Sequence, residues 1–423
     1  MATPAVLFHL WPGNAGVVAA ALRRLPGHAL VTREATLKTQ ELSNQAGRCS
    51  LLGDLLLPEH LAAVETAVQA GLEAAADLFA GKDWESLCAR YGFDPLDMRR
   101  ALRRDLTDEW RRQIFLIESL ERAATRYALG AVVLNEEYSA ESKALVKWAV
   151  RRGIPVLHVF HGMAMEGIYN RAADLEADMV SGFGPRHAES LQDLGLLSGR
   201  IADTGNPAWS RFSQLAGMKD KCREALAKLM KWGHGPLFVF GTTLSPFNAA
   251  TARPGSLSRA ARAFFRSGRK LSASHPDAIW VVLLRPTDPP GLEADMKGWA
   301  KAEGLHTGSV HCFRSDSELF LAAAQAVVSI DSCLSVEALL AGTPAINLYS
   351  DAGWRMGPAF AAGTGVEEVS EDGLDDALGR AMSGSGLDTR LREEAVSVYH
   401  PPRGRDPAEK VVDWVESRVR ALI

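Results

Sequence analysis

The sequence has no run of eighteen apolar residues, so we expect no membrane-spanning helix. Residues 1–16 carry no lysine or arginine ahead of their apolar segment, which argues against a secretion signal. The five cysteines have no C-x-x-C spacing, a pattern typical of a reduced chain with neither a disulfide framework nor a zinc knuckle. We therefore expect a cytoplasmic protein, with contact to the inner face of a membrane left open.

Two further absences limit the chemistry. The sequence contains no D-x-D motif and no cluster of histidines and cysteines, so we expect no metal site. The formal net charge of −4 gives no reason to expect nucleic acid as a partner. With 423 residues, the chain is long enough for two α/β domains of about 200 residues each.

The most informative stretch is residues 327–350. An apolar run over 326–330 predicts a buried parallel strand, and residues 336–341 follow a polar turn as a short helix. Gly342 is placed to end that helix in the left-handed conformation, and 345–348 return as another strand. The segment therefore predicts a strand–helix–strand unit of a parallel sheet.

The polar turn of this unit is a candidate ligand site, because ligands of open α/β sheets bind where a strand leads into the next helix. Free N–H groups at the start of the helix suit a phosphate, and the side chains of Asp331, Ser332 and Ser335 lie beside them. Glu337 suits sugar hydroxyls, such as those of a nucleotide's ribose. The alternative is an ordinary βαβ unit with a serine N-cap.

Two strands in the first half of the chain end in polar residues. The strand 131–134 is followed by Glu136 and Glu137, and the strand 156–160 by His161. A right-handed crossover would bring these side chains to the same edge of one sheet, where a proton could be removed from an acceptor hydroxyl. The alternative for His161 is a buried histidine with a hydrogen bond to the backbone. The alternative for one of the two glutamates is a solvent-facing position at the start of a helix.

The second half repeats this pattern. A strand over 236–240 leads into the small-residue turn of Gly241, Thr242 and Thr243, which are candidate ligand-binding residues at the end of a strand. The next strand, 279–284, ends at Arg285, whose charge could neutralise a diphosphate. The alternative for Arg285 is a surface ion pair with Asp288.

Three segments carry a resemblance to known families: E-A-L-x-x-G-x-P at 337–344, P-x-x-x-x-x-H-G at 155–162, and T-G-N-P at 204–207. Together they resemble the two-domain glycosyltransferases of the GT-B fold. The chain looks most like the capsular-polysaccharide (Kdo-type) transferases, the CDP-glycerol glycerophosphotransferases and the UDP-GlcNAc 2-epimerases.

The resemblance implies an α/β fold of two Rossmann-like, doubly wound parallel-sheet domains with a cleft between them. It implies an N-terminal acceptor-side domain over 1–209, a linker helix over 210–235, a nucleotide-sugar domain over 236–404, and a helix over 405–423 that crosses back to the first domain. Residues 210–231 read as one charged helix.

The activity that this resemblance implies is metal-independent transfer of a sugar from a CMP-, UDP- or CDP-linked donor to a polysaccharide, lipid-linked or protein acceptor. His161 would activate the acceptor. The alternatives are a sugar-nucleotide 2-epimerase or hydrolase, and a non-catalytic glycosylation partner. The relatives carry R/K-x-H-P after the strand that ends here at Arg285; this chain keeps the arginine but not the histidine, which leaves the nucleotide open.

Two other segments have patterns that predict local structure. Residues 99–112 carry six arginines, which predicts a solvated helix face or, alternatively, an acceptor or membrane-surface contact. Residues 314–318 read as a helix start with side-chain capping.

Overall fold

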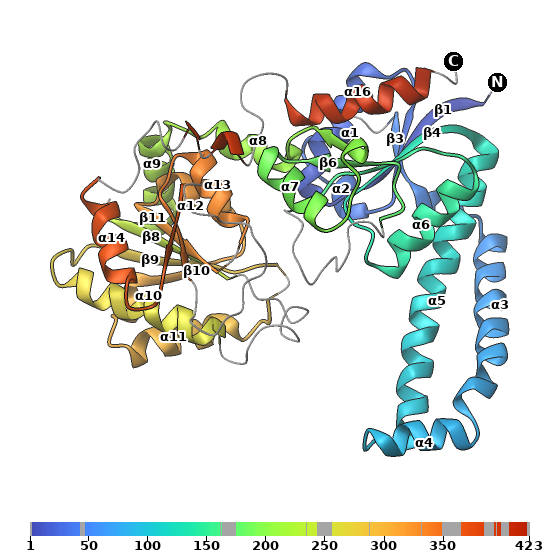
Figure 1. The fold of residues 1–423 in the computed structure, drawn as a ribbon, viewed down its shortest axis with the longest axis horizontal. Helices are drawn as coiled ribbons and strands as arrows, with labels where there is room; N and C mark the ends of the chain where they lie inside the picture. The colour runs from blue at the N-terminus through green and yellow to red at the C-terminus, as the bar shows by residue number, and fades with distance from the viewer. Residues whose placement is uncertain are drawn as a thin grey trace.

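A computed structural model describes residues 2–42, 47–160, 162, 175–233, 235–242, 256–286, 288–330, 332–348, 365–384, 393–394, 396–398 and 406–420. The chain forms two lobes, each built on one parallel sheet (Figure 1). The N-terminal lobe carries the sheet of β1 to β7, and the C-terminal lobe that of β8 to β13.

The N-terminal sheet has seven strands in the order β3-β2-β1-β4-β5-β6-β7. All of its pairings are parallel. The strands are β1 (Thr3–His9), β2 (His28–Val31), β3 (Cys49–Leu51), β4 (Tyr127–Leu134), β5 (Val156–His158), β6 (Met179–Gly182) and β7 (Ile201–Asp203).

The C-terminal sheet has six strands in the order β10-β9-β8-β11-β12-β13, again all parallel. The strands are β8 (Leu237–Gly241), β9 (Ile279–Leu283), β10 (Val310–Phe313), β11 (Ala326–Ser329), β12 (Ala345–Leu348) and β13 (Val366–Val369). Both sheets therefore have the doubly wound order, in which the chain reverses its direction across the sheet beside its first strand. This confirms the predicted fold class.

Helices fill the connections. Those of the N-terminal lobe are α1 (Ala15–Arg24), α2 (Glu34–Leu37), α3 (Pro58–Ala75), α4 (Lys82–Arg90), α5 (Pro95–Arg126), α6 (Ala140–Arg151) and α7 (Pro185–Asp193). The later helices are α8 (Ser210–Ser213), α9 (Lys219–Met230), α10 (Ser256–Ser272), α11 (Leu292–Ala302), α12 (Ser317–Ala323), α13 (Leu334–Ala341), α14 (Leu374–Met382) and α16 (Pro407–Val419). Short 3-10 turns are η1 (Pro12–Asn14), η2 (Leu52–Leu55), η3 (Ala76–Phe79), η5 (Ser198–Arg200), η6 (Pro207–Trp209) and η7 (Thr307–Ser309).

Each sheet is covered on both faces because alternate strand residues point to opposite sides. In the N-terminal lobe, Val6 and Phe8 pack with α1 and α16, whereas Leu7 packs with α5 and α6. In the C-terminal lobe, Val239 packs with α12 and α13, and Phe240 with α10 and α14. Two buried layers per lobe explain why these strands are apolar on both faces.

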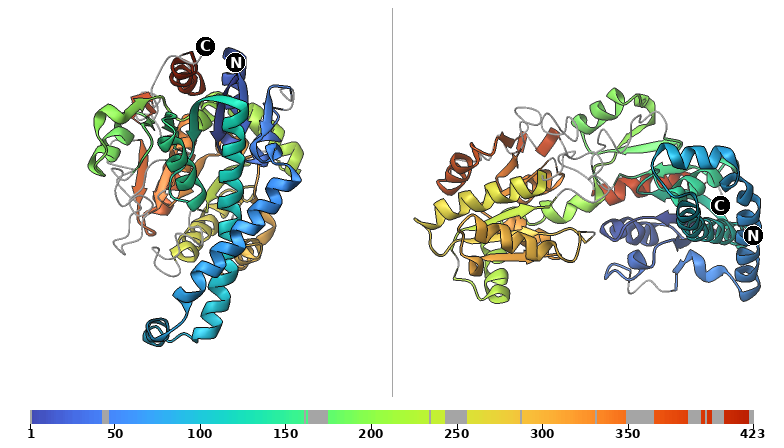
Figure 2. Two further views of the ribbon diagram at one scale, coloured as in Figure 1. Left: turned by 90° about the vertical axis from the view of Figure 1, so that its right-hand side faces the viewer. Right: turned by 90° about the horizontal axis from the view of Figure 1, so that it is seen from below.

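The last helix, α16, lies on the N-terminal lobe against α1, far from the C-terminal sheet that precedes it in the chain (Figures 1 and 2). Val411, Val412 and Val415 are buried in that contact. Arg24 of α1 forms ion pairs with Glu409 and Asp413 of α16 at 3.2 and 2.8 Å. Apolar burial flanked by ion pairs therefore fixes the C-terminal segment to the first lobe.

The segment predicted as one helix over 210–231 forms two helices instead. Helix α8 ends at Ser213, and α9 begins at Lys219. Gly217 between them has φ +79°, a left-handed conformation that interrupts a right-handed helix. Trp209 and Phe212, at this junction, are fully buried in a cluster that contains residues of both lobes.

The predicted capping at residues 314–318 is also wrong. Helix α12 begins after Asp316, but that residue has φ +57°, and its side chain accepts no hydrogen bond from the helix backbone. Its carboxylate instead accepts from the Ser315 hydroxyl at 2.8 Å. Elsewhere local prediction succeeded: Gly342 ends α13 with φ +91°, as expected.

Candidate active site between the two sheets

The carboxyl ends of the two sheets are turned towards each other. A Cβ atom on Gly162, just after β5, would lie 3.4 Å from Sγ of Cys333, just before α13. In each sheet the chain reverses beside the first strand: between β1 and β4 in the N-terminal lobe, and between β8 and β11 in the C-terminal lobe. Such switch points are where open parallel sheets bind ligands.

Asn135 ties three strand ends together at the N-terminal switch point. Its side chain is fully buried, accepts a hydrogen bond from the Trp11 N–H at 2.5 Å and donates one to the Val159 carbonyl at 2.7 Å. The ends of β1, β4 and β5 are thereby held at fixed positions relative to one another.

Glu136 follows Asn135 and is buried, with its carboxylate surrounded by donors. It accepts hydrogen bonds from the N–H groups of Tyr138 and Ser139 at 2.9 and 3.0 Å, and from the hydroxyls of Ser139 and Ser142. Burial by itself raises the pKa of Glu136, but the hydrogen bonds from His9, Ser139 and Ser142 outweigh it and hold the pKa well below the usual range. Such a carboxylate is a weak base and suits positioning of the turn into α6.

The sequence reading missed His9 and Arg33, which complete this cluster. His9 ends β1, and its Nδ1 lies 2.7 Å from the Thr32 hydroxyl while its Nε2 lies 2.8 Å from an Arg33 nitrogen. Burial, opposed by the hydrogen bond to Glu136, lowers the pKa of His9. The Arg33 guanidinium lies 4.0 Å above the Trp11 ring and 3.7 Å from Glu136. The only available sequence signal was that each polar residue falls at the end of an apolar strand.

Glu137 faces the next strand. Its Oε1 lies 2.9 Å from Nδ1 of His158, the last residue of β5, and its Oε2 accepts the Glu176 N–H at 2.8 Å. His158 is fully buried and Glu137 nearly so. Sequence reasoning named Glu137 but not His158, because a histidine within an apolar strand gives no sign of which way its ring turns.

The candidate phosphate turn is described in part. The Ser332 hydroxyl accepts the Leu334 N–H at 3.2 Å at the start of α13. The Ser335 hydroxyl is fully buried and lies 2.8 Å from that of Ser329 on β11. Ser332 adjoins Cys333, which faces Gly162 of the other lobe, so Ser332 belongs to the lobe-facing turn, whereas Ser335 joins helix to strand.

Gly241 and Thr242 lie at the end of β8, beside α13. A Cβ atom on Gly241 would come within 2.1 Å of the Leu334 side chain, so the need for glycine there comes from helix packing. The Thr242 hydroxyl donates to the Leu283 carbonyl at 3.1 Å and to Asp288 at 2.5 Å. These contacts join the ends of β8 and β9.

Arg285 begins the loop after β9. Its N–H donates to the buried Asp288 carboxylate at 2.7 Å, so Asp288 shapes the loop from inside rather than pairing at the surface. Arg314 donates to the Arg285 carbonyl at 2.5 Å. The loop that carries the Arg285 guanidinium is thus held from two sides.

Tyr138 connects the two edges electrostatically. Its ring is 46% exposed. Burial and the charge of Glu136 raise the pKa of its hydroxyl, and the charges of Arg33 and Arg285 oppose that rise. The Tyr138 hydroxyl is thus within electrostatic reach of one arginine from each lobe.

Glu337 faces the lobe junction. The pKa of its carboxyl is raised to about 7 by burial, against the favourable influence of Arg211 and of the Trp209 indole. Both partners belong to the junction formed by η6 and α8. The structure therefore places Glu337 against the segment that joins the lobes.

Three predicted site residues, His161, Thr243 and Asp331, lie outside the described residues. Within the described part of the chain, no group of three or more His, Cys, Asp and Glu side chains is placed to hold a metal ion. In the same part, every helix is too short or too polar to span a bilayer.

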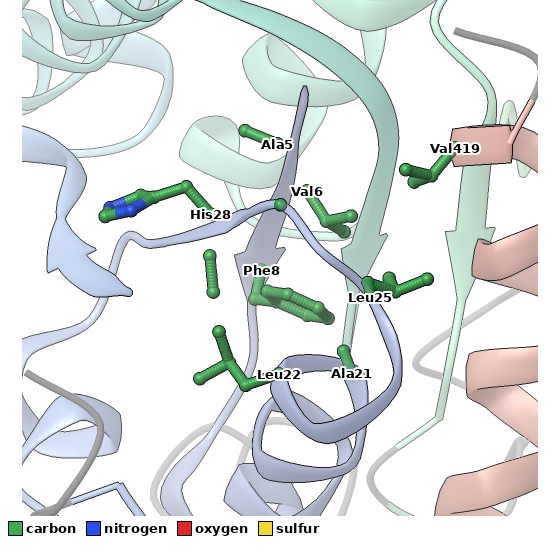
Figure 3. A pocket seen from close by; sticks show the side chains of 10 residues that line it. Ala5, Val6, Phe8, Ala21, Leu22, Leu25, His28 and Val419 are labelled. Carbon is green, nitrogen blue, oxygen red and sulfur yellow. The ribbon is translucent and has the colours of Figure 1, made fainter. Parts of the chain in front are cut away.

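One apolar cavity lies elsewhere, between β1, β2, α1 and α16 (Figure 3). Its lining includes Phe8, Leu22, Leu25 and Val419. It also touches Gly27 and His28, where β2 begins, so it opens towards the amino edge of the sheet and is separate from the candidate site.

The fold and the facing switch points define a two-lobed protein of the GT-B fold. The sequence matches no family model, and no curated protein matches it as a relative. Solved structures that match over the whole chain share the fold. The UDP-GlcNAc 2-epimerase of Neisseria meningitidis, bound to UDP-GlcNAc, superposes with a TM-score of 0.57 at 12% identity, covering 99% of this chain and 100% of that one.

Two further structures agree with this result. MnaA of S. aureus in complex with UDP gives a TM-score of 0.53 at 13% identity, covering 99% of this chain and 97% of that one. A glycosyltransferase from Rickettsia africae gives 0.54 at 9% identity, covering 99% of each chain. At these identities the likeness shows the fold.

Proposed function

We propose that this protein is a glycosyltransferase that moves a sugar from a nucleotide-sugar donor to a polysaccharide, lipid-linked or protein acceptor. The observation that carries the proposal is the contact of Gly162 with Cys333. It supports a single site to which both lobes contribute, with the residues after β5 opposite the turn before α13.

The donor would lie on the C-terminal lobe. Ser332 and the first N–H groups of α13 would hold its phosphates, helped by Thr243 and the helix dipole, and the Asp331 carboxylate would accept hydrogen bonds from donor hydroxyls. Arg285 would neutralise the charge that develops on the leaving nucleotide. The donor site would be supported indirectly by Ser335, Gly241 and Thr242, because their contacts hold α13, β8, β9 and β11 together.

The acceptor would lie on the N-terminal lobe. His161 follows β5 in the chain, and we propose that its imidazole takes the acceptor's proton, since an ordinary histidine titrates near neutrality. Glu137, bonded to His158, is the second candidate base. Glu136 would act as a positioning residue, because its carboxylate is already occupied by donors from the protein.

A second candidate function is that of a sugar-nucleotide 2-epimerase or hydrolase. One observation favours it: the Neisseria meningitidis protein with the same fold is a UDP-GlcNAc 2-epimerase. A non-catalytic partner in a glycosylation complex is the third candidate. It would be favoured if the wild type bound none of the nucleotides tested.

The first experiment is a thermal-shift panel with UDP, CMP, CDP and GDP on the wild type and on Arg285→Gln. A ligand of the folded state raises the melting temperature according to its concentration relative to Kd. We expect one nucleotide to stabilise the wild type and its affinity to fall about tenfold or more in the variant, since a charge-assisted contact is lost. A panel without any shift would contradict the proposal.

The second experiment separates the candidate activities. The matching nucleotide sugar is incubated without acceptor, with and without EDTA, and the products are followed by NMR. An isomerised sugar nucleotide identifies an epimerase and would refute glycosyl transfer. A donor that stays intact by itself and is consumed only after glycan or lipid extract is added supports transfer. The same rate of consumption with EDTA present supports metal independence.

A further inference from the structure

A helical arm projects from the N-terminal lobe (Figures 1 and 2). It consists of α3 and the first half of α5, which pack along each other through Val64, Val68 and Leu72, with α4 lying across the end. A Cβ atom on Gly53, just after β3, would lie 3.0 Å from the Phe115 ring of α5. Residues of α5 before Phe115 therefore extend beyond the carboxyl edge of the sheet, for roughly 30 Å at 1.5 Å per residue.

The end of this arm exposes an unusual amount of apolar surface. We call it the arm tip, and it comprises the residues from Leu78 to Arg104. Its exposed apolar side chains are Leu78 (73% exposed), Leu87 (50%), Tyr91 (61%), Phe93 (52%) and Leu96 (59%). Thirteen large apolar side chains are exposed in the described residues, and five of them fall in this short segment. Such clustering marks an interaction surface rather than the scattered exposure that is normal for soluble proteins.

The arm tip carries six basic and four acidic residues, and its positive charge is concentrated at residues 99–104. Four of the six residues 99–104 are arginines, in a chain whose net charge is −4. Arg100 and Arg104 have carboxylate partners, Asp97 at 3.7 Å and Asp105 at 3.1 Å. Arg103 is exposed and, within the described part of the chain, has no carboxylate within the 4.0 Å of an ion pair, whereas Arg99 is half-buried with its Nε enclosed. The side chains of Arg100 and Arg104 are 81% and 75% exposed, so their surface pairs leave the charges open to water and to an anionic surface.

We propose that the arm tip docks on an anionic phospholipid surface. Leu87, Tyr91 and Phe93 would enter the boundary between headgroups and acyl chains. The exposed Arg100, Arg103 and Arg104 would meet lipid phosphates. Aromatic side chains suit this depth because their rings are amphipathic. The short helix α4 lies across the arm's end, as a segment resting on a planar surface must.

The position of the arm determines where a docked membrane would lie relative to the candidate site. The arm extends past the carboxyl edge of the N-terminal sheet, the edge that carries Asn135 and Glu136. A membrane held by the tip would therefore lie on the same side as the candidate site. This inference does not depend on the nucleotide site, so either can fail while the other stands.

The experiment is co-sedimentation of the full chain with two kinds of vesicle, phosphatidylcholine alone and phosphatidylcholine with about 30% phosphatidylglycerol. We expect binding to the anionic vesicles and about tenfold less to the neutral ones, with the difference removed by high salt. The variant Leu87→Ser/Tyr91→Ser/Phe93→Ser should lose about tenfold or more in affinity, because apolar insertion is lost. Arg100→Gln/Arg103→Gln/Arg104→Gln should abolish the preference for anionic lipid.

The matched control is Leu197→Ser/Leu229→Ser, which removes equally exposed apolar side chains elsewhere (72% and 60% exposed) and should bind as the wild type does. Thermal unfolding and the nucleotide shift of each variant show that the fold is kept. Failure of the wild type to sediment with anionic vesicles would overturn the proposal, as would unchanged binding by the triple variant. A wild-type dimer that the triple variant converts to monomer would also overturn it, since the tip would then be a self-interface.

Discussion

Gly162 of the N-terminal lobe lies against Cys333 of the C-terminal lobe, and a Cβ atom at Gly162 would be 3.4 Å from the Cys333 sulfur. The two residues follow β5 and precede α13, so their contact brings the ends of two sheets together. It brings the end of residues 155–162 to the turn that leads into α13, the helix that carries the start of residues 337–344.

Enlarging the side chain at this contact should separate the lobes. Gly162→Ala needs little adjustment, whereas Gly162→Leu must displace Cys333 and should cost about 1–3 kcal/mol through overpacking. We expect the leucine variant to lose most of its nucleotide-induced thermal shift and to show a larger radius of gyration by small-angle X-ray scattering. Gly199→Leu is the control, since nothing lies within 4 Å of a Cβ there. Equal nucleotide binding by Gly162→Leu would show that the contact is not needed.

Glu136 should matter for stability more than for chemistry. Glu136→Gln replaces a buried carboxylate that accepts hydrogen bonds from Ser139 and Ser142, and should cost about 2–4 kcal/mol in urea unfolding. Because the pKa of Glu136 is lowered on folding, its contribution is present above the usual carboxyl pKa and is lost as the pH falls below it. The exposed Glu85→Gln is the control. A stable but inactive Glu136→Gln enzyme would instead indicate a direct role in catalysis.

The two serines of α13 should behave differently. Ser335→Ala removes a buried hydroxyl pair with Ser329 and should cost about 1 kcal/mol of stability, with little change in nucleotide affinity. Ser332→Ala should leave stability nearly unchanged but weaken nucleotide binding, because Ser332 lies at the lobe-facing turn. Calorimetric titration with the nucleotide identified by the thermal-shift panel measures both variants. The reverse pattern would move the ligand away from this turn.

Glu337 should make the lobe junction sensitive to pH. Its pKa is raised to about 7, so the folded protein binds more protons there than the unfolded chain, and stability falls as the pH rises from the ordinary carboxyl range to about 7. Glu337→Gln should remove that fall and be more stable than the wild type at pH 8 by about 1–2 kcal/mol, a value reduced because the side chain is partly exposed. Urea unfolding at several pH values measures the difference. A wild type and variant with parallel stability curves would contradict the prediction.

The architecture could be predicted from local sequence because its signals are local. Apolar runs such as 131–134 and 326–330 predict strands buried on both faces, and turn residues such as Gly342 mark where the intervening helices end. The doubly wound order is what the resemblance to the GT-B fold implied, since alternating strands and helices with right-handed crossovers also fit a closed barrel. For the same reason, Glu136, Glu137 and the turn before α13 could be assigned to sheet edges without coordinates.

Side-chain directions could not be predicted in this way. Ser335 and Ser332 are equivalent in sequence as polar residues of one turn, yet one hydroxyl bonds to β11 and the other lies at the lobe-facing turn. His9 and Arg33 join Glu136 only because β1, β2 and β4 are neighbours in the sheet. The contacts of His9 and Arg33 with Glu136 join segments more than a hundred residues apart, and even the nearby Ser329–Ser335 pair depends on how helix and strand pack.

By itself, then, the sequence determined the order of strands and helices and the edges at which polar residues gather, because each depends on a few neighbouring residues. The tertiary structure alone decided which of those residues face the other lobe, that Glu337 meets the junction, and that α3 to α5 form a projecting arm. The physical reason is that the burial, pKa and partner of a side chain are set by whatever packs against it, and most of that packing comes from distant parts of the chain.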